Sequence, residues 1–182
     1  VKRVARILVL FGLSLHAAAQ QGWVSQTSGT NAFLVGVWAI DTTTCIAVGM
    51  DGTLLRTSDG GTTWGQVPIG TTAWLNAVTF TRAGTGFIVG DSGIMLQTTD
   101  EGQHWVRRPT GTMNSLGGIS FHDSSIGFAV GDRGTVLRTT NGGLDWTVQH
   151  LDSLYFLWDV AVVSEDSAIT IGLPFAAGPE RA

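Results

Sequence analysis

The 182-residue sequence is poor in charge and contains a single lysine and a single cysteine. Charged residues make up 13% of the chain, about half of the ~25% that is usual for soluble domains. Hydrophobic residues reach 43%, and a chain this apolar can offset the entropy of folding, which excludes an intrinsically disordered protein. Because Cys45 has no second cysteine to pair with, an intrachain disulfide is excluded as well.

Long hydrophobic runs are also missing. The apolar run at residues 7–15 is far shorter than the ~20 residues that a membrane-spanning helix needs. It follows the basic residues Lys2, Arg3 and Arg6 and precedes three alanines at 17–19. This order is typical of a secretory signal peptide, which we predict over residues 1–19, with a periplasmic or extracellular location for the remaining chain. A buried first strand or helix is the alternative interpretation.

The expected net charge argues against polyanionic partners. Cleavage after Ala19 would remove three of the ten basic residues and none of the fourteen acidic ones, so the net charge would change from −4 to −7. A protein with this charge is not expected to bind nucleic acid or an anionic membrane surface. Nothing in the sequence predicts membrane insertion after cleavage.

Glycine and tryptophan, in contrast, are abundant, with 25 and seven residues. Glycine is therefore about twice as frequent as in an average protein. Each glycine inside a helix costs ~1 kcal/mol relative to alanine, so long helices are not expected. The composition favours a β protein that is rich in turns.

The sequence repeats every 41 residues without any insertion. The spacing links tryptophans, leucines and glycines, and it also links apolar columns such as Val37, Val78, Ile119 and Val160. The three columns of identical residues are Trp23, Trp64, Trp105 and Trp146; Leu34, Leu75, Leu116 and Leu157; and Gly49, Gly90, Gly131 and Gly172. A repeat of this length indicates a solenoid, a propeller or an array of supersecondary units.

Within each repeat, the short apolar segments separated by Gly/Asp turns predict four antiparallel strands. A four-stranded unit of this length is typical of a β-propeller blade. We therefore predict an all-β propeller domain over residues 20–182, with blades at about 34–68, 75–109 and 116–150 and a partial blade at 157–182. The strand at 22–27 would belong to a preceding or a closing blade. About three and a half blades are present, which favours an incomplete ring over a ring of four blades closed by the Trp23 strand.

The turn between the third and fourth strands carries the most specific motif, [ST]-[DN]-x-G-x-x-W. We expect its acidic or amide side chain to bond the backbone two residues on, its Ser/Thr hydroxyl to add a local bond, and its glycine to adopt a positive φ. The tryptophan would cover the hairpin. The motif residues are Ser58, Asp59, Gly61 and Trp64; Thr99, Asp100, Gly102 and Trp105; and Thr140, Asn141, Gly143 and Trp146.

This motif resembles the Asp-box, or bacterial neuraminidase repeat, and the fuller repeat from Val48-Gly49 to Trp64 is similar to that of the photosystem II stability/assembly factor family. The resemblance implies a non-catalytic, exported propeller scaffold that binds a protein partner and is lumenal in photosynthetic relatives. In that family a basic patch is implicated in partner binding. By resemblance, this role can be transferred only to Arg56 and Arg138, which belong to the repeat motif and share one repeat column. The alternative interpretation of both arginines is that they bond neighbouring loops.

An enzymatic function is not predicted. A sialidase would need an arginine triad and a tyrosine nucleophile, but Tyr155 is the only tyrosine. No catalytic residue, cofactor or metal site is predicted, because each glycine-flanked aspartate supplies only one or two oxygens of the six to eight that calcium needs. The alternative function is the N-terminal part of a larger secreted protein, such as a sialidase-like glycosidase or an adhesin.

Overall fold

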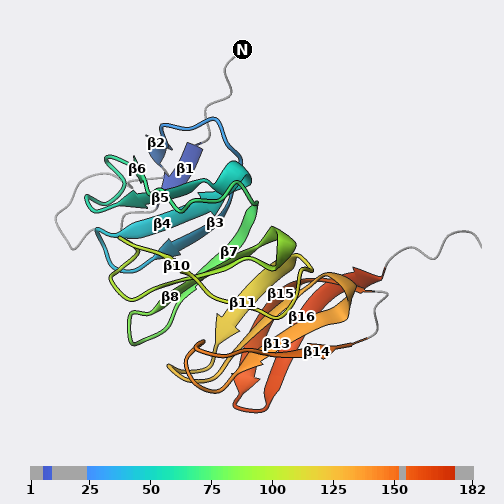
Figure 1. Ribbon diagram of the computed structural model, residues 1–182. Coiled ribbons are helices and arrows are strands. Elements are labelled where there is room, and N and C mark those ends of the chain that lie inside the picture. The colour runs from blue at the N-terminus through green and yellow to red at the C-terminus, as the bar shows by residue number, and fades with distance from the viewer. Residues whose placement is uncertain (1–5, 10–23, 152–154, 175–182) are drawn as a thin grey trace, which may run out of the picture.

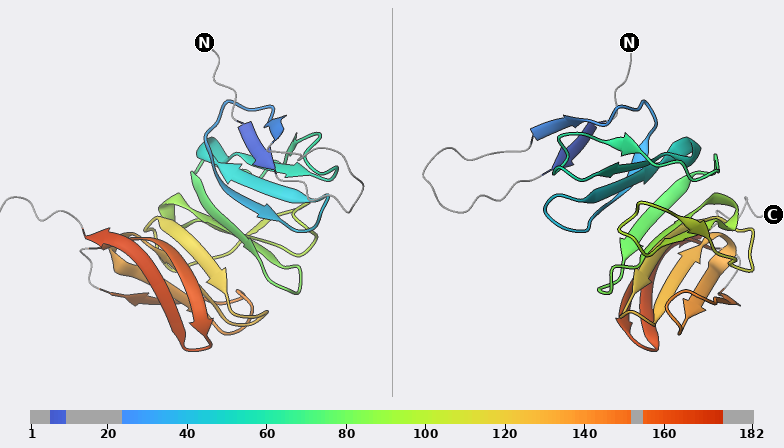
Figure 2. Two further views of the ribbon diagram at one scale, coloured as in Figure 1. Left: turned by 180° about the vertical axis from the view of Figure 1, so that it is seen from behind. Right: turned by 60° about the vertical axis from the view of Figure 1, so that its left-hand side comes forward.

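The computed structural model of the protein describes residues 6–9, 24–151 and 155–174. Strands dominate these residues, and they form three four-stranded antiparallel sheets and two two-stranded sheets. The sheets follow one another around an open arc, from the β1–β2 ribbon at one end to the β15–β16 sheet at the other (Figures 1 and 2). The predicted fold class, an all-β propeller of four-stranded antiparallel blades, is confirmed.

Each four-stranded sheet is one blade, and its strands pair in sequence order. Blade 1 contains β3 (Leu34–Ala39), β4 (Cys45–Gly49), β5 (Leu54–Thr57) and β6 (Gly65–Gln66). Blade 2 contains β7 (Leu75–Phe80), β8 (Gly86–Gly90), β9 (Met95–Thr98) and β10 (Val106–Arg107). Blade 3 contains β11 (Leu116–Phe121), β12 (Gly127–Gly131), β13 (Thr135–Thr139) and β14 (Thr147–His150).

The remaining strands form the two ends of the arc. The hairpin of β15 (Tyr155–Ser164) and β16 (Ser167–Pro174) continues the arc after blade 3. At the other end, β1 (Arg6–Val9) pairs with β2 (Val24–Thr27), and neither strand joins the β15–β16 sheet. β1 lies in the segment that we predict as a signal peptide, whereas Trp23 lies outside the described residues.

The hydrophobic core lies between the blades, where apolar side chains from the second strand of one blade pack against the next blade. Ile46 and Val48 of blade 1 pack with Leu75 and Val78 of blade 2. Further along the arc, the junctions are formed by Phe87 and Val89 with Leu116 and Ile119, and by Phe128 and Val130 with Leu157 and Val160. The apolar columns of the repeat are therefore columns of junction residues.

A size compensation explains why the lone cysteine is tolerated in blade 1. In blades 2 and 3, Phe80 and Phe121 lie over Gly86 and Gly127, where a Cβ atom would collide with the phenyl rings. In blade 1 the corresponding cross-strand pair is Ala39 and Cys45. The small alanine leaves room for the half-buried thiol, so Cys45 has a packing role.

The junctions make the second-strand residues the most sensitive positions for stability. Phe87 is fully buried, its ring stacks on Phe121 with centroids 4.6 Å apart, and it meets Trp146 edge-on. We expect Phe87→Ala to lower the free energy of unfolding by about 3–5 kcal/mol, because the truncation leaves a cavity at the junction. Chemical denaturation measures this loss. The matched control Phe33→Ala removes an exposed ring and should change stability by less than about 0.5 kcal/mol; similar losses for both variants would contradict this account of the core.

Candidate functional site

The predicted Asp-box segments form three closely similar turns, called here the box turns, at residues 57–64, 98–105 and 139–146. In the first, the Thr57 hydroxyl donates to Asp59 Oδ1 over 2.8 Å and accepts the Gly61 N–H over 2.9 Å. Asp59 Oδ1 in turn accepts the Thr63 N–H over 2.9 Å. The same three bonds recur in the second turn around Thr98 and Asp100 and in the third around Thr139 and Asn141.

Two expectations about these turns were wrong. The hydroxyl that closes the turn belongs to the residue before the predicted Ser/Thr position: Thr57, Thr98 and Thr139 are buried, while Ser58, Thr99 and Thr140 are exposed. The Asp or Asn side chain bonds the N–H four residues on and not two. This longer bond spans the whole turn, because the intervening glycine has a φ of 86°, 78° or 79° in the three turns and so reverses the chain between the two groups.

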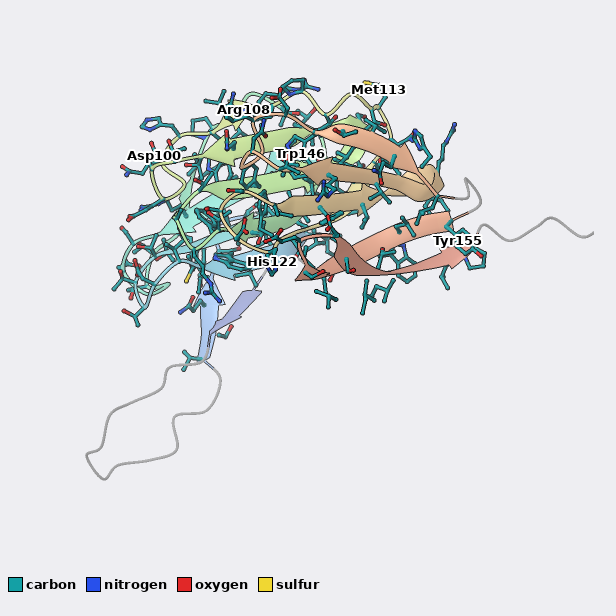
Figure 3. The ribbon with its side chains drawn as sticks, turned by 90° about the horizontal axis from the view of Figure 1, so that it is seen from below. Asp100, Arg108, Met113, His122, Trp146 and Tyr155 are labelled. Atoms are coloured by element: carbon teal, nitrogen blue, oxygen red, sulfur yellow. The ribbon has the colours of Figure 1, made fainter. Side chains whose placement is uncertain are left out.

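The box turns are junction elements at the outer part of the blades. The glycines Gly102 and Gly143 lie against Ile46 and Phe87 of the preceding blade, so closely that a Cβ atom would collide with those side chains. In the first turn, the side chain of Gln26 lies in the same place over Gly61 and accepts the Trp64 indole N–H over 3.2 Å. Figure 3 shows Asp100 at the side of the molecule opposite to Tyr155. All these contacts give the box residues a structural role.

The two arginines predicted as possible partner contacts link successive blades. Arg56 donates from Nε to the Glu101 carbonyl over 2.9 Å. Arg138 donates to the Glu165 carbonyl and to Asp166 Oδ1, and it lies over the Phe128 ring at 5.7 Å. Gln97, between them in the repeat column, donates to the Gly142 carbonyl. The structure thus brings each side chain to the following blade, and it does not bring the two arginines together.

A concave groove runs along the first strands of the blades, on the inner side of the arc. Two adjoining hollows of about 620 and 500 Å³ make up the groove. The residues that line them belong to β3, β7, β11 and β15 and to the turns next to these strands. The residues that line both hollows are Val35, Asn76, Gly117 and Trp158. They are spaced 41 residues apart and therefore form one repeat column.

The sequence analysis predicted no binding role for these four positions, called here the groove column, although their variation from repeat to repeat is visible in the sequence. The junction columns keep one chemical type through all repeats, whereas this column changes from valine to asparagine, glycine and tryptophan. A position that accepts valine, asparagine, glycine and tryptophan is free to differ from blade to blade. It can therefore carry binding specificity, as loops and rims of rigid scaffolds commonly do.

The groove has an acidic and aromatic character. Asp91 and Asp132 lie at one end with Trp74 and Trp158, and Asp159 lies farther along. Asn76 fixes the rim, because its Nδ2 donates to Asp91 Oδ1 over 3.1 Å and to the Leu116 carbonyl over 2.9 Å. Burial raises the pKa of Asp132, and the charge of Asp91 adds to that effect against the opposing charge of Arg133. The lining residues of the two hollows include these three acids and no cationic side chain.

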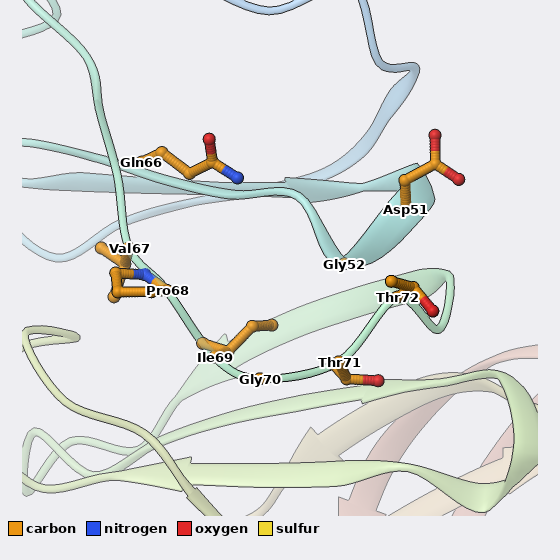
Figure 4. Close-up of a pocket in the computed structure, with 9 residues that line it drawn as sticks. All are labelled: Asp51, Gly52, Gln66, Val67, Pro68, Ile69, Gly70, Thr71 and Thr72. Carbon is orange, nitrogen blue, oxygen red and sulfur yellow. The ribbon is translucent and has the colours of Figure 1, made fainter.

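Two other hollows belong to the repeat itself. Figure 4 shows one that is lined by Asp51, Gly52 and the connecting segment 66–72. A second hollow, lined by Gly93 and residues 107–113, lies 41 residues further along the chain. Because the connection between successive blades forms both, neither hollow is a dedicated site.

In the described part of the chain, no group of three or more His, Cys, Asp or Glu side chains could hold a metal ion. No helix within the described ranges is both long and apolar enough to cross a membrane.

The fold and groove define the class of the protein as a repeat β-propeller, present here as an open arc. The family model described as photosynthesis system II assembly factor YCF48 matches residues 15–113. That match covers more than half of the chain, and the chain belongs to this family. No match was found among curated proteins.

Solved structures agree with this assignment. A structure of YCF48 bound to D1 peptide is 28% identical with a TM-score of 0.61, and the match covers 69% of this chain and 42% of that one. YCF48 from Cyanidioschyzon merolae is 15% identical with a TM-score of 0.65, over 85% of this chain and 58% of that one. The GH74 enzyme of Niastella koreensis, 14% identical with a TM-score of 0.64 over 82% and 28% of the two chains, shows similarity of fold alone. This chain thus spans about half the length of the YCF48 chains that it matches.

The reassigned hydroxyl group makes a prediction about the box turns. Thr98→Val keeps the shape of a buried side chain but removes the hydroxyl that bonds Gly102 N–H and Asp100. We expect a loss of about 1–3 kcal/mol in the free energy of unfolding, because the buried Gly102 N–H loses its acceptor and Asp100 loses one of its donors. Thr99→Val, at the exposed neighbouring position, is the matched control and should change stability by less than about 0.5 kcal/mol. Denaturant unfolding distinguishes the two, and a larger effect at Thr99 would contradict the reassignment.

Acid should weaken the box turns. Hydrogen bonds from the Thr63 hydroxyl, and then from the Thr63 backbone N–H, lower the pKa of Asp59 from 3.8 to about 2. Because the folded pKa lies below the unfolded one, this carboxylate stabilises the fold above about pH 4, and the contribution disappears as the pH falls towards 2. Asn141 occupies the same place without a charge, so Asp59→Asn should fold but lose part of this acid dependence. Melting temperatures measured across this pH range test the prediction, and parallel curves for both proteins would contradict it.

Proposed function

We propose that this protein is a non-catalytic scaffold whose inner groove binds a peptide segment of a protein partner. The observation that carries the proposal is the groove column Val35, Asn76, Gly117 and Trp158, which lies open along the inner strands and differs in each repeat. The related YCF48 structure bound to D1 peptide supports a peptide as the ligand. D1 is therefore the first partner to test, in a role in photosystem II assembly.

The groove chemistry indicates which peptide would bind. Trp158 is 55% exposed and Trp74 is 39% exposed, so both indole rings can pack against apolar or cationic side chains of a ligand. The carboxylates of Asp91 and Asp132 at the same end of the groove favour a positively charged group. We therefore propose that the bound segment combines apolar residues with at least one arginine or lysine.

Arg56 and Arg138 remain the alternative contact site for a partner. Their hydrogen bonds to Glu101 and Glu165 of the following blades account for their position without a ligand. A partner that bound there would need acidic groups, in contrast to the groove, and would meet the outer side of the junctions. The proposal of an exported protein rests on the predicted signal peptide at residues 1–19, as does the periplasmic, extracellular or lumenal location.

Binding of a fluorescently labelled D1 peptide, followed by anisotropy, tests the groove. We expect Trp158→Ala and Asn76→Trp to weaken binding at least about tenfold, equal to 1.4 kcal/mol, since the first removes an aromatic contact and the second fills the groove. Met113→Ala changes a 76% exposed residue that does not line the groove; it is the control and should bind normally.

A second variant separates the groove from the arginine site. Arg56→Gln keeps an amide donor, as Gln97 does in the same repeat column, but removes the positive charge. Binding that falls in Arg56→Gln and stays unchanged in Trp158→Ala would place the partner at the arginines and refute the groove. Absence of binding by the wild-type protein to the D1 peptide would refute D1 as the partner.

A further inference from the structure

The third box turn differs from the other two in the pair of side chains that closes it. In the first turn the Thr63 hydroxyl donates to Asp59 Oδ2 over 2.6 Å, and the second turn has the same arrangement with a histidine in place of the threonine. In the third turn the roles are reversed, because Asn141 Nδ2 donates to Asp145 Oδ2 over 2.9 Å. A carboxylate can only accept hydrogen bonds, so residue 141 must carry an amide for this pair to form.

The backbone of the turn places a glycine directly after this asparagine. Gly142 has a φ of 70°, and the corresponding residues Gly60 and Glu101 have φ values of 69° and 59°. Glycine adopts this conformation without steric cost, and it makes Asn141 the only asparagine of the sequence that a glycine follows. Such a pair is chemically labile, because no side chain on the glycine hinders the approach of its backbone nitrogen to the asparagine Cγ atom.

We propose that Asn141 is a site of spontaneous deamidation, which the folded turn suppresses and whose product keeps the turn open. In the reaction, the Gly142 backbone nitrogen attacks Asn141 Cγ, and the new N–C bond replaces the bond from Cγ to Nδ2. The proton of the Gly142 N–H moves to the departing amino group, which leaves as ammonia. Water then opens the succinimide ring to aspartate or isoaspartate. The net change is an amide converted to a carboxylate, with one water consumed and one ammonia released.

The native turn holds both reacting groups away from this reaction. The Gly142 N–H donates to the Ser125 carbonyl over 2.8 Å, so the attacking nitrogen is bound to the neighbouring loop. Asn141 Oδ1 accepts the Thr139 hydroxyl and the Asp145 N–H, each over 3.0 Å, and the bond from Nδ2 fixes the other side of the amide. Deamidation therefore requires the turn to open, and its rate follows the population of the open turn.

The product of deamidation cannot close the turn again. An aspartate at 141 would place two carboxylates where Asn141 Nδ2 and Asp145 Oδ2 are now 2.9 Å apart, with no proton to share and with like charges that repel. Isoaspartate would also lengthen the backbone between Thr139 and Gly143. Because Gly143 lies against Phe87 of blade 2, an open turn weakens the junction between blades 2 and 3.

Peptide mapping by mass spectrometry tests the modification itself. The full chain is incubated in mildly alkaline buffer, with and without denaturing urea, and the deamidated fraction at each asparagine is followed with time. We expect Asn141 to react first in the unfolded chain and at least about tenfold more slowly in the folded chain. Equal rates in the folded and unfolded chains, or earlier deamidation at Asn31, Asn76 or Asn114, would overturn the proposal.

Substitutions test the effect of the product on the turn. Asn141→Asp should lower the melting temperature by about 2–4 °C and speed hydrogen exchange at the Gly143 amide, which donates to the Thr139 hydroxyl.

The matched control makes the same replacement in an Asp145→Thr chain. The double variant recreates the Asp59 and Thr63 pair of the first turn, so Asn141→Asp should cost no measurable stability there. A double variant that folds when Asn141→Asp alone does not would give the same support. An unchanged melting temperature in Asn141→Asp, or an equal loss in both backgrounds, would refute the conflict between the two carboxylates and with it the proposal.

Discussion

The contact between the second strand of one blade and the first strand and box turn of the next is the interaction on which this structure depends. Ile46 and Phe87 fill the space over Gly102 and Gly143, where no Cβ atom could fit. A single blade has two apolar faces, and a two-faced sheet of four short strands cannot bury both by itself. Stability therefore comes from the repetition of one junction, and each blade is folded because its neighbours cover it.

The same constraint separates the residues that build the scaffold from those that can bind. Junction and box columns are held to one chemical type in each repeat, including the buried threonines Thr57, Thr98 and Thr139 and the arginine or glutamine that reaches the next blade. The inner groove column is exempt, because its residues line the open hollows of the groove and none of them is fully buried in a junction. Diversity among Val35, Asn76, Gly117 and Trp158 thus has a physical cause in the architecture.

Much of the fold could be predicted because the repeat is exact. Strands β7 and β8 begin where alternation and the Gly/Asp turns place them, and Gly61, Gly102 and Gly143 have the positive φ expected of the motif. The hydrogen bonding of the box turn could not be predicted in detail. Thr57 and Ser58 are both hydroxyl residues, and Thr98 and Thr99 are identical, so sequence spacing alone cannot tell which side chain faces the turn. Only the pleat of the strand, which points alternate residues to opposite sides, decides it.

The sequence by itself determined the repeat unit, its four strands and the apolar identity of the junction columns, because these depend on local periodicity and turn chemistry. The tertiary structure alone decided which members of one column are buried. Val37 and Val78 are identical residues in identical registers, as are Ile46 and Ile169, yet one of each pair is exposed and the other is covered. Burial depends on whether a neighbouring sheet is present, and that is a property of the arc and not of any single repeat.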